Sequence, residues 1–95
     1  MLINVTRELK NGEEVIKIED KSLTVREVLM RILLEVPIKD ATVDSVMKNY
    51  KLGEAVRNND EVEFTSEDVT MVKNLIIGQY IPLVAGQVIN ILEGN

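Results

Sequence analysis

The chain has 95 residues, of which 45% are hydrophobic but only one is phenylalanine and two are tyrosine, so one compact domain with an aliphatic core is expected. It contains no cysteine and no histidine, which excludes disulfides, thiolate nucleophiles and the commonest general base near neutral pH. The net charge of -5 disfavours binding to the phosphates of nucleic acids.

The first 21 residues are predicted to form a β-hairpin. The segments INVTREL and EVIKIE alternate apolar and polar residues, as strands with one buried face do. Asn11 and Gly12 lie between them, and this pair tolerates the positive φ angles of a tight turn. Because an isolated hairpin is barely stable in water, it is expected to pack on the remainder of the chain.

A central helix is predicted from Thr24 to Val36. Thr24 can cap the first turn while Glu27 returns a hydrogen bond, and Pro37 ends the helix by disfavouring helical backbone at the residue before it. Helical spacing relates the apolar residues Val25, Val28, Leu29, Ile32 and Val36.

A second helix, predicted from about Thr42 to Asn58, carries apolar residues on two faces. One stripe contains Val43, Val46, Met47 and Tyr50, and the stripe on nearly the opposite face contains Leu52, Ala55 and Val56. Two explanations stay open: the helix bends near Gly53, or it lies between two packing partners.

A short extended segment is expected at residues 61–64, followed by a third helix from Ser66 to about Gln79. Thr65 and Asp68 are spaced as the capping pair of that helix. Residues 22–95 are therefore expected to form a helical bundle within a single domain that spans residues 1–95.

The stretch from Asn74 to Leu92 contains no charged residue, but a membrane span is not expected there. Its 19 residues barely match a bilayer core, and they include a proline, two glycines and four amide side chains. Gly78 weakens the third helix, and Pro82 suits the first turn of a new helix that begins near Ile81. The stretch is predicted to form a helix pair broken at Pro82.

The last helix is the candidate interface for self-association. Ala85 and Gly86 are small enough for another backbone to approach closely, and a short chain with so long an uncharged stretch has apolar surface to cover. The alternative is that this face packs against the first helix of the same chain. The candidate interface residues are Ile81, Val84, Ala85, Gly86, Val88, Ile89 and Leu92.

No catalytic, cofactor-binding or metal-binding residue is predicted, and enzymatic activity is not expected. The serines have no histidine to activate them, and the glycines are isolated and do not form a phosphate-binding loop. The residues that could contact a small ligand, in a pocket between subunits, are Tyr80, Arg26 and Arg31.

Three segments, LTVREVL, VEFTSEDVTMVKNLIIG and YIPLVAGQVINILEG, together with the Asn-Gly hairpin, resemble a group of small uncharacterised proteins of tailed bacteriophages and prophages. The shared motifs cap and pack helices, so the resemblance implies a phage protein acting in the host cytoplasm and carries over no site residue.

These observations predict an α+β fold, mostly α, in which an N-terminal β-hairpin packs on about four helices. The expected function is that of a non-enzymatic interaction protein, a homo-oligomer that binds a phage or host protein. One alternative is a protein that binds or sequesters a small ligand such as a nucleotide signal. The other is a regulator associated with nucleic acid, which the charge disfavours.

Overall fold

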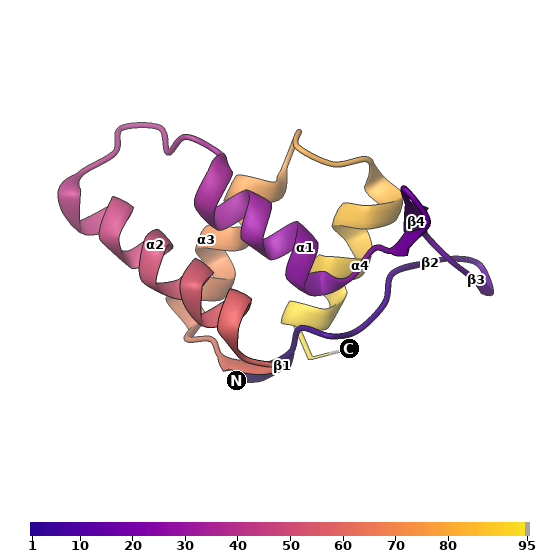
Figure 1. Ribbon diagram of the computed structural model, residues 1–95. Helices are drawn as coiled ribbons and strands as arrows, with labels where there is room; N and C mark the ends of the chain where they lie inside the picture. Colours follow the sequence, from indigo (N-terminus) through magenta and orange to yellow (C-terminus); the bar gives the residue numbers. More distant parts are fainter. Residues whose placement is uncertain (95) are drawn as a thin grey trace.

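The computed structural model describes residues 1–94 and shows the predicted α+β architecture, which is mostly helical. Within this part of the chain, four α-helices and one π-helical turn follow a region of short strands (Figure 1). The molecule measures 41 × 25 × 23 Å. It is elongated because helix α2 (Val43–Asn58) and the N-terminal hairpins project from opposite ends of the core.

The N-terminal region differs from the single hairpin predicted for residues 1–21. Strand β1 (Leu2–Asn4) pairs with the distant strand β6 (Glu61–Glu63) in antiparallel fashion, so that Ile3 lies opposite Val62. The expected segment 61–64 is thus a strand whose partner is the start of the chain. The sequence pattern identified both strands as extended but could not reveal that they pair.

A hairpin does form near the predicted place, between β2 (Lys10–Asn11) and β3 (Glu14–Val15). Its turn consists of Gly12 and Glu13, because Asn11 belongs to the strand and only Gly12 has a positive φ, of 67°. Glycine at the first central position is typical of a type II′ turn, which matches the twist of the two strands.

A second hairpin joins β4 (Lys17–Ile18) to β5 (Lys21–Ser22). The residues of its turn, Glu19 and Asp20, have φ angles of 51° and 64°. Two consecutive positive φ angles are typical of a type I′ turn, which usually contains asparagine or glycine. The sequence pattern does not predict this hairpin, because neither asparagine nor glycine is present at its turn.

The predicted central helix consists of α1 (Val25–Met30) and the π-helical turn η1 (Arg31–Glu35), and it ends before Pro37 as expected. The Thr24 hydroxyl accepts a hydrogen bond from the backbone N–H of Glu27, with 3.4 Å between the atoms. Together, α1 and η1 contact α2 and also α3 (Ser66–Ile76), which confirms their central position.

Two further helices, α2 and α3, begin at capping residues. A capping box of Thr42 and Ser45 closes the first turn of α2, and one of Thr65 and Asp68 closes the first turn of α3. Helix α3 ends at Ile76, earlier than predicted, because Ile77 adopts extended backbone and Gly78 has a φ of 80°.

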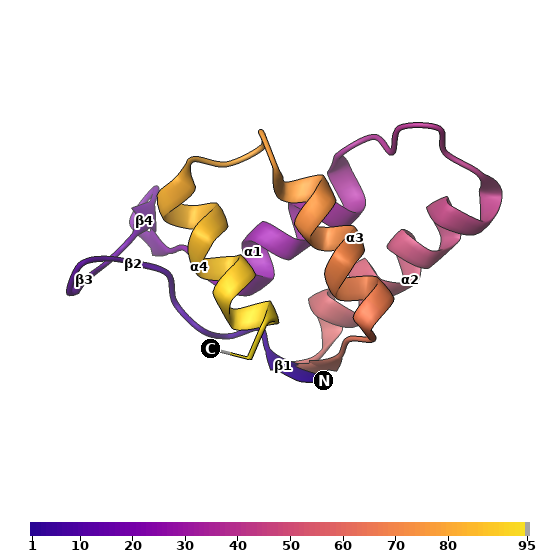
Figure 2. The same cartoon turned by 180° about the vertical axis from the view of Figure 1, so that it is seen from behind.

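Helix α4 (Pro82–Leu92) has Pro82 as its first residue, where the missing amide hydrogen of proline costs no helical hydrogen bond. Residues 77–81 form a non-helical turn between α3 and α4, and we call them the α3–α4 turn. Figure 2 shows α3 and α4 in front of α1, with the α3–α4 turn above them.

The core lies where α1 and η1 meet the other helices, and β1 and β6 contribute to it from the end that holds the N-terminus (Figures 1 and 2). It is almost entirely aliphatic, as the composition predicts. Its buried residues are Ile3, Val5, Leu9, Leu23, Val25, Val28, Leu29, Ile32, Leu33, Val56, Val62, Phe64, Val72, Ile76, Val84, Val88 and Leu92.

The packing of α2 on η1 generates a prediction. A methyl group at Gly53 would meet the Leu34 side chain, whose Cγ would be 2.6 Å away, whereas one at Gly86 would meet no atom within 4 Å. We expect Gly53→Ala to lower the free energy of unfolding by about 1–3 kcal/mol through overpacking. The control Gly86→Ala should raise it by up to about 1 kcal/mol, because alanine favours helix. Urea denaturation of both variants checks the contrast, and equal stabilisation would contradict it.

Candidate functional site

The N-terminal half of α2 exposes an apolar surface that the core leaves uncovered. Val43, Val46, Met47 and Tyr50 are 80%, 48%, 43% and 53% exposed, and we call these four residues the α2 patch. Helical spacing places them in one stripe, as the sequence predicts. Large apolar side chains gathered in this way on a small monomer are typical of an interaction site.

The structure shows which part of α2 the chain covers. The helix is continuous through Gly53, and its buried residues lie from Asn49 onward, so α2 is not packed between two partners along its whole length. A bend near Gly53 stays a prediction. The side facing the core carries Asn49, Gly53 and Val56, which are all buried. The stripe of Val43 and Met47 therefore has no packing partner among the described residues.

A groove lies beside the α2 patch, between α2 and the segment that leads to it from η1. It has a volume of about 230 Å³. Figure 1 shows that the loop of residues 36–42 spans the separated ends of η1 and α2. The residues that line this α2 groove are Leu33, Leu34, Val36, Pro37, Ile38, Val46, Asn49 and Tyr50.

Asn49 is the polar residue of the groove that matters most. It is 2% exposed, and neither its amide nitrogen nor its carbonyl oxygen has a hydrogen-bond partner within residues 1–94. It is also the single buried polar side chain in that part of the protein. A buried amide without partners costs about 1–3 kcal/mol of stability. The amide carries one donor group and one acceptor, and the protein encloses both atoms.

The chemistry of the α2 groove suits binding. No carboxylate, lysine or arginine lines it, and an amide neither accepts nor releases a proton near neutral pH. Over residues 1–94, no group of three or more aspartates and glutamates is placed to hold a metal ion. The groove can therefore accommodate apolar side chains.

The structure places the candidate interface residues of α4 largely inside the protein. Val84, Val88 and Leu92 are buried in the core, Ala85 and Ile89 are partly buried, and Ile81 and Gly86 are exposed. Assigning the first three to an interface between chains was wrong, because they occupy one stripe that the fold itself covers. Helix α4 packs within the chain and contacts α3. Packing against the first helix, the alternative considered from the sequence, stays a prediction.

The structure brings two of the three candidate ligand contacts, Arg31 and Tyr80, together and places Arg26 elsewhere. The guanidinium carbon of Arg31 lies 5.5 Å from the centre of the Tyr80 ring, a cation–π contact that ties η1 to the α3–α4 turn. Burial raises the pKa of the Tyr80 phenol above its ordinary value, and the positive charge of Arg31 opposes that change.

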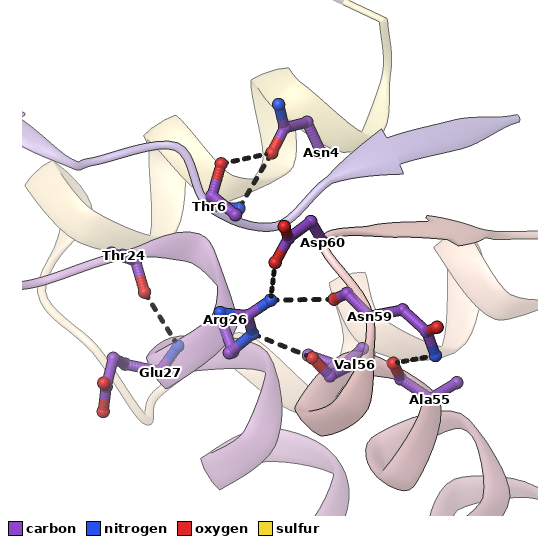
Figure 3. Close-up of polar contacts among 9 residues, drawn as sticks. All are labelled: Asn4, Thr6, Thr24, Arg26, Glu27, Ala55, Val56, Asn59 and Asp60. Carbon is purple, nitrogen blue, oxygen red and sulfur yellow. Dashed lines mark hydrogen bonds and ion pairs between the residues drawn. The ribbon is translucent and has the colours of Figure 1, made fainter.

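Arg26 has a structural role at the other end of α2. Figure 3 shows its guanidinium donating to the carbonyl oxygens of Val56 and Asn59, at 3.0 and 2.8 Å, and to the Asp60 carboxylate at 2.7 Å. It thereby satisfies carbonyls that the end of the helix leaves without partners. Arg26 therefore has a structural role at the end of α2, and its role as a ligand contact stays a prediction.

Asn49 is not among the candidate site residues predicted from the sequence. A signal was present, because Asn49 shares helical spacing with Val46, Gly53 and Val56 and is the one amide in that row. An amide on a helix face that otherwise carries apolar or small residues is a candidate for a buried polar contact. The pattern gave no means of deciding which row of α2 faces the core.

The comparisons with known proteins found no protein-family model, no curated protein and no solved structure that matches this chain. Among residues 1–94, no helix has both the length and the apolar character needed to cross a membrane.

The role of Arg26 can be tested by a substitution that keeps its charge. Arg26→Lys removes the planar fork that reaches two carbonyls and a carboxylate, so we expect the free energy of unfolding to fall by about 1–3 kcal/mol. The control is Arg57→Lys, since Arg57 makes an exposed pair with Glu54 at 3.7 Å and should matter by less than about 0.5 kcal/mol. Equal urea midpoints for the two variants would contradict this role.

Replacing the unpaired Asn49 amide is predicted to raise the free energy of unfolding, whereas replacing Arg26 is predicted to lower it. Asn49→Leu removes the buried polar group and should raise the free energy of unfolding by about 1–3 kcal/mol in dilute solution. The control Asn74→Leu replaces an exposed asparagine on α3 and should change it by less than about 0.5 kcal/mol. Destabilisation by Asn49→Leu in thermal and urea unfolding would show that the amide stabilises the isolated fold.

Proposed function

We propose that this chain is a non-enzymatic interaction protein that binds an apolar protein segment in the α2 groove. The observation that carries the proposal is the unpaired amide of Asn49, buried in a groove that adjoins four exposed apolar side chains. Natural proteins pair nearly all their buried polar groups, so an amide of this kind points to a partner.

The dimensions of the α2 groove favour a protein segment over a metabolite. Its volume of about 230 Å³ lies below the range of about 300–1,000 Å³ that is usual for small-molecule pockets. A nucleotide would also need cationic or amide-rich surroundings for its phosphates, and no arginine or lysine lines the groove. One or two aliphatic side chains of a partner, held beside the α2 patch, fit the groove better.

The resemblance to proteins of tailed phages supports a phage or host protein as the partner, encountered in the host cytoplasm. The net charge of -5 supports a protein partner more than a nucleic acid. Self-association remains part of the proposal, but its surface is the α2 groove and its neighbouring patch, because the core occupies the main apolar stripe of α4.

Selection from a displayed library of short random peptides tests this function. We expect enrichment of extended peptides with two or more aliphatic residues, whose affinity for the protein falls about tenfold or more in Val46→Asp, since a charge then lies at the groove. The control Ile18→Asp places the same charge on an exposed isoleucine of β4 and should leave affinity unchanged. If no peptide prefers the unaltered protein over Val46→Asp in fluorescence anisotropy, the function is different.

A further inference from the structure

We infer that the α2 patch is the contact surface between two copies of this chain, whose α2 helices pack side by side in antiparallel orientation. The inference rests on the self-association that is part of the proposed function, since it names the partner and the geometry of the contact. Three observations carry it: the exposure of the patch at one end of the molecule, the order of the residues along it, and the row of charges beside it.

The α2 patch lies where a second molecule can reach it. Figures 1 and 2 show α2 at the end of the molecule opposite the N-terminal hairpins, with its N-terminal half leading away from the core. The four side chains of the patch are all at least 43% exposed, and two of them are methionine and tyrosine, residue types that are enriched at protein interfaces. A second copy of α2 can therefore pack on the patch while the body of each molecule lies at the far end of its own helix.

The order of residues along the patch suits an antiparallel pair of helices. A two-fold axis that passes between residues 46 and 47 places Val43 of each copy level with Tyr50 of the other, because these two residues are equally far from the axis. The same axis places Val46 level with Met47. Apolar side chains therefore meet apolar side chains along the whole patch, which is the self-complementarity that a two-fold contact requires.

A row of charges beside the patch is complementary to itself in the same arrangement. Asp44, Lys48 and Lys51 are exposed and are spaced four and three residues apart, so they share one face of α2 next to the patch. Within residues 1–94, Lys48 pairs with Glu67 at 3.4 Å, whereas Asp44 and Lys51 take part in no ion pair. Antiparallel pairing brings the two charged rows side by side in opposite directions, so that Asp44 of each copy lies beside Lys51 of the other.

The same charges disfavour parallel pairing of the two helices. In a parallel two-fold pair, the charged row of one helix lies against the opposite flank of its partner. That flank carries Asn49 and Gly53, which the fold itself buries. Asp44 then meets no lysine of the second copy. The antiparallel arrangement is therefore the one that both the apolar patch and the charged row favour.

Sedimentation equilibrium of the purified chain and of charge-reversal variants tests this inference. We expect a monomer–dimer equilibrium that is detectable at protein concentrations up to about 1 mM. Asp44→Lys and Lys51→Asp should each weaken dimerisation about fivefold or more, because each reversal replaces two attractive contacts with two repulsive ones. The control Lys21→Asp makes the same change in net charge at an exposed residue of β5 and should dimerise like the unaltered chain. Circular dichroism should show the same helical content for all three variants.

Mixing Asp44→Lys with Lys51→Asp distinguishes antiparallel from parallel pairing. In their antiparallel heterodimer each introduced charge faces an opposite charge of the partner, so the mixture should associate more tightly than either variant alone. A chain that stays monomeric up to about 1 mM would overturn the inference. A dimer that is insensitive to both reversals, or a mixture that associates no better than the separate variants, would overturn it too.

Met47→Asp separates this inference from the proposed function. Met47 belongs to the α2 patch but does not line the α2 groove, so this variant should dimerise about tenfold or more weakly while still binding the selected peptides. A Met47→Asp variant that dimerises like the unaltered chain would contradict the inference and leave the proposed function standing. The proposed function fails separately, when no peptide prefers the unaltered protein over Val46→Asp.

Discussion

The close contact between α2 and the central α1–η1 segment is the constraint on which the architecture of the site depends. Gly53 allows Leu34 to approach the backbone of α2, and Arg26 holds the C-terminal carbonyls of the same helix. Both contacts lie in the C-terminal half of α2. The N-terminal half is separated from η1 by the loop of residues 36–42, and the groove and the exposed apolar stripe lie there.

Asn49 is the place where the structure departs from what stability alone would select. A leucine at this position would suit the apolar surroundings, whereas the amide is buried without a partner in the isolated chain. Departures of this kind concentrate at functional sites, where a loss of stability is offset by specific recognition. Val46 and Tyr50 line the same groove and are about half exposed.

The uncharged C-terminal stretch illustrates how a small aliphatic protein uses its apolar residues. A chain of this size buries only a modest fraction of its surface, and with three aromatic residues it needs many aliphatic side chains to form a core. Helix α4 therefore contributes Val84, Val88 and Leu92 to the interior. What remains exposed of the stretch is mainly Ile77, Ile81 and, to a lesser extent, Leu83, around the α3–α4 turn.

Local interactions within a few residues determined most of what the sequence by itself could establish. Thr24, Thr42 and Thr65 start three helices through side-chain hydrogen bonds to their own first turns, and Pro37 and Pro82 act on adjacent backbone, so these limits were readable. The tertiary structure alone decided that β1 pairs with β6, that α4 faces inward, and that Asn49 rather than Tyr50 is buried in the groove. Such choices depend on contacts between segments far apart in the chain, and periodicity shows which residues share a face without showing which face the fold covers.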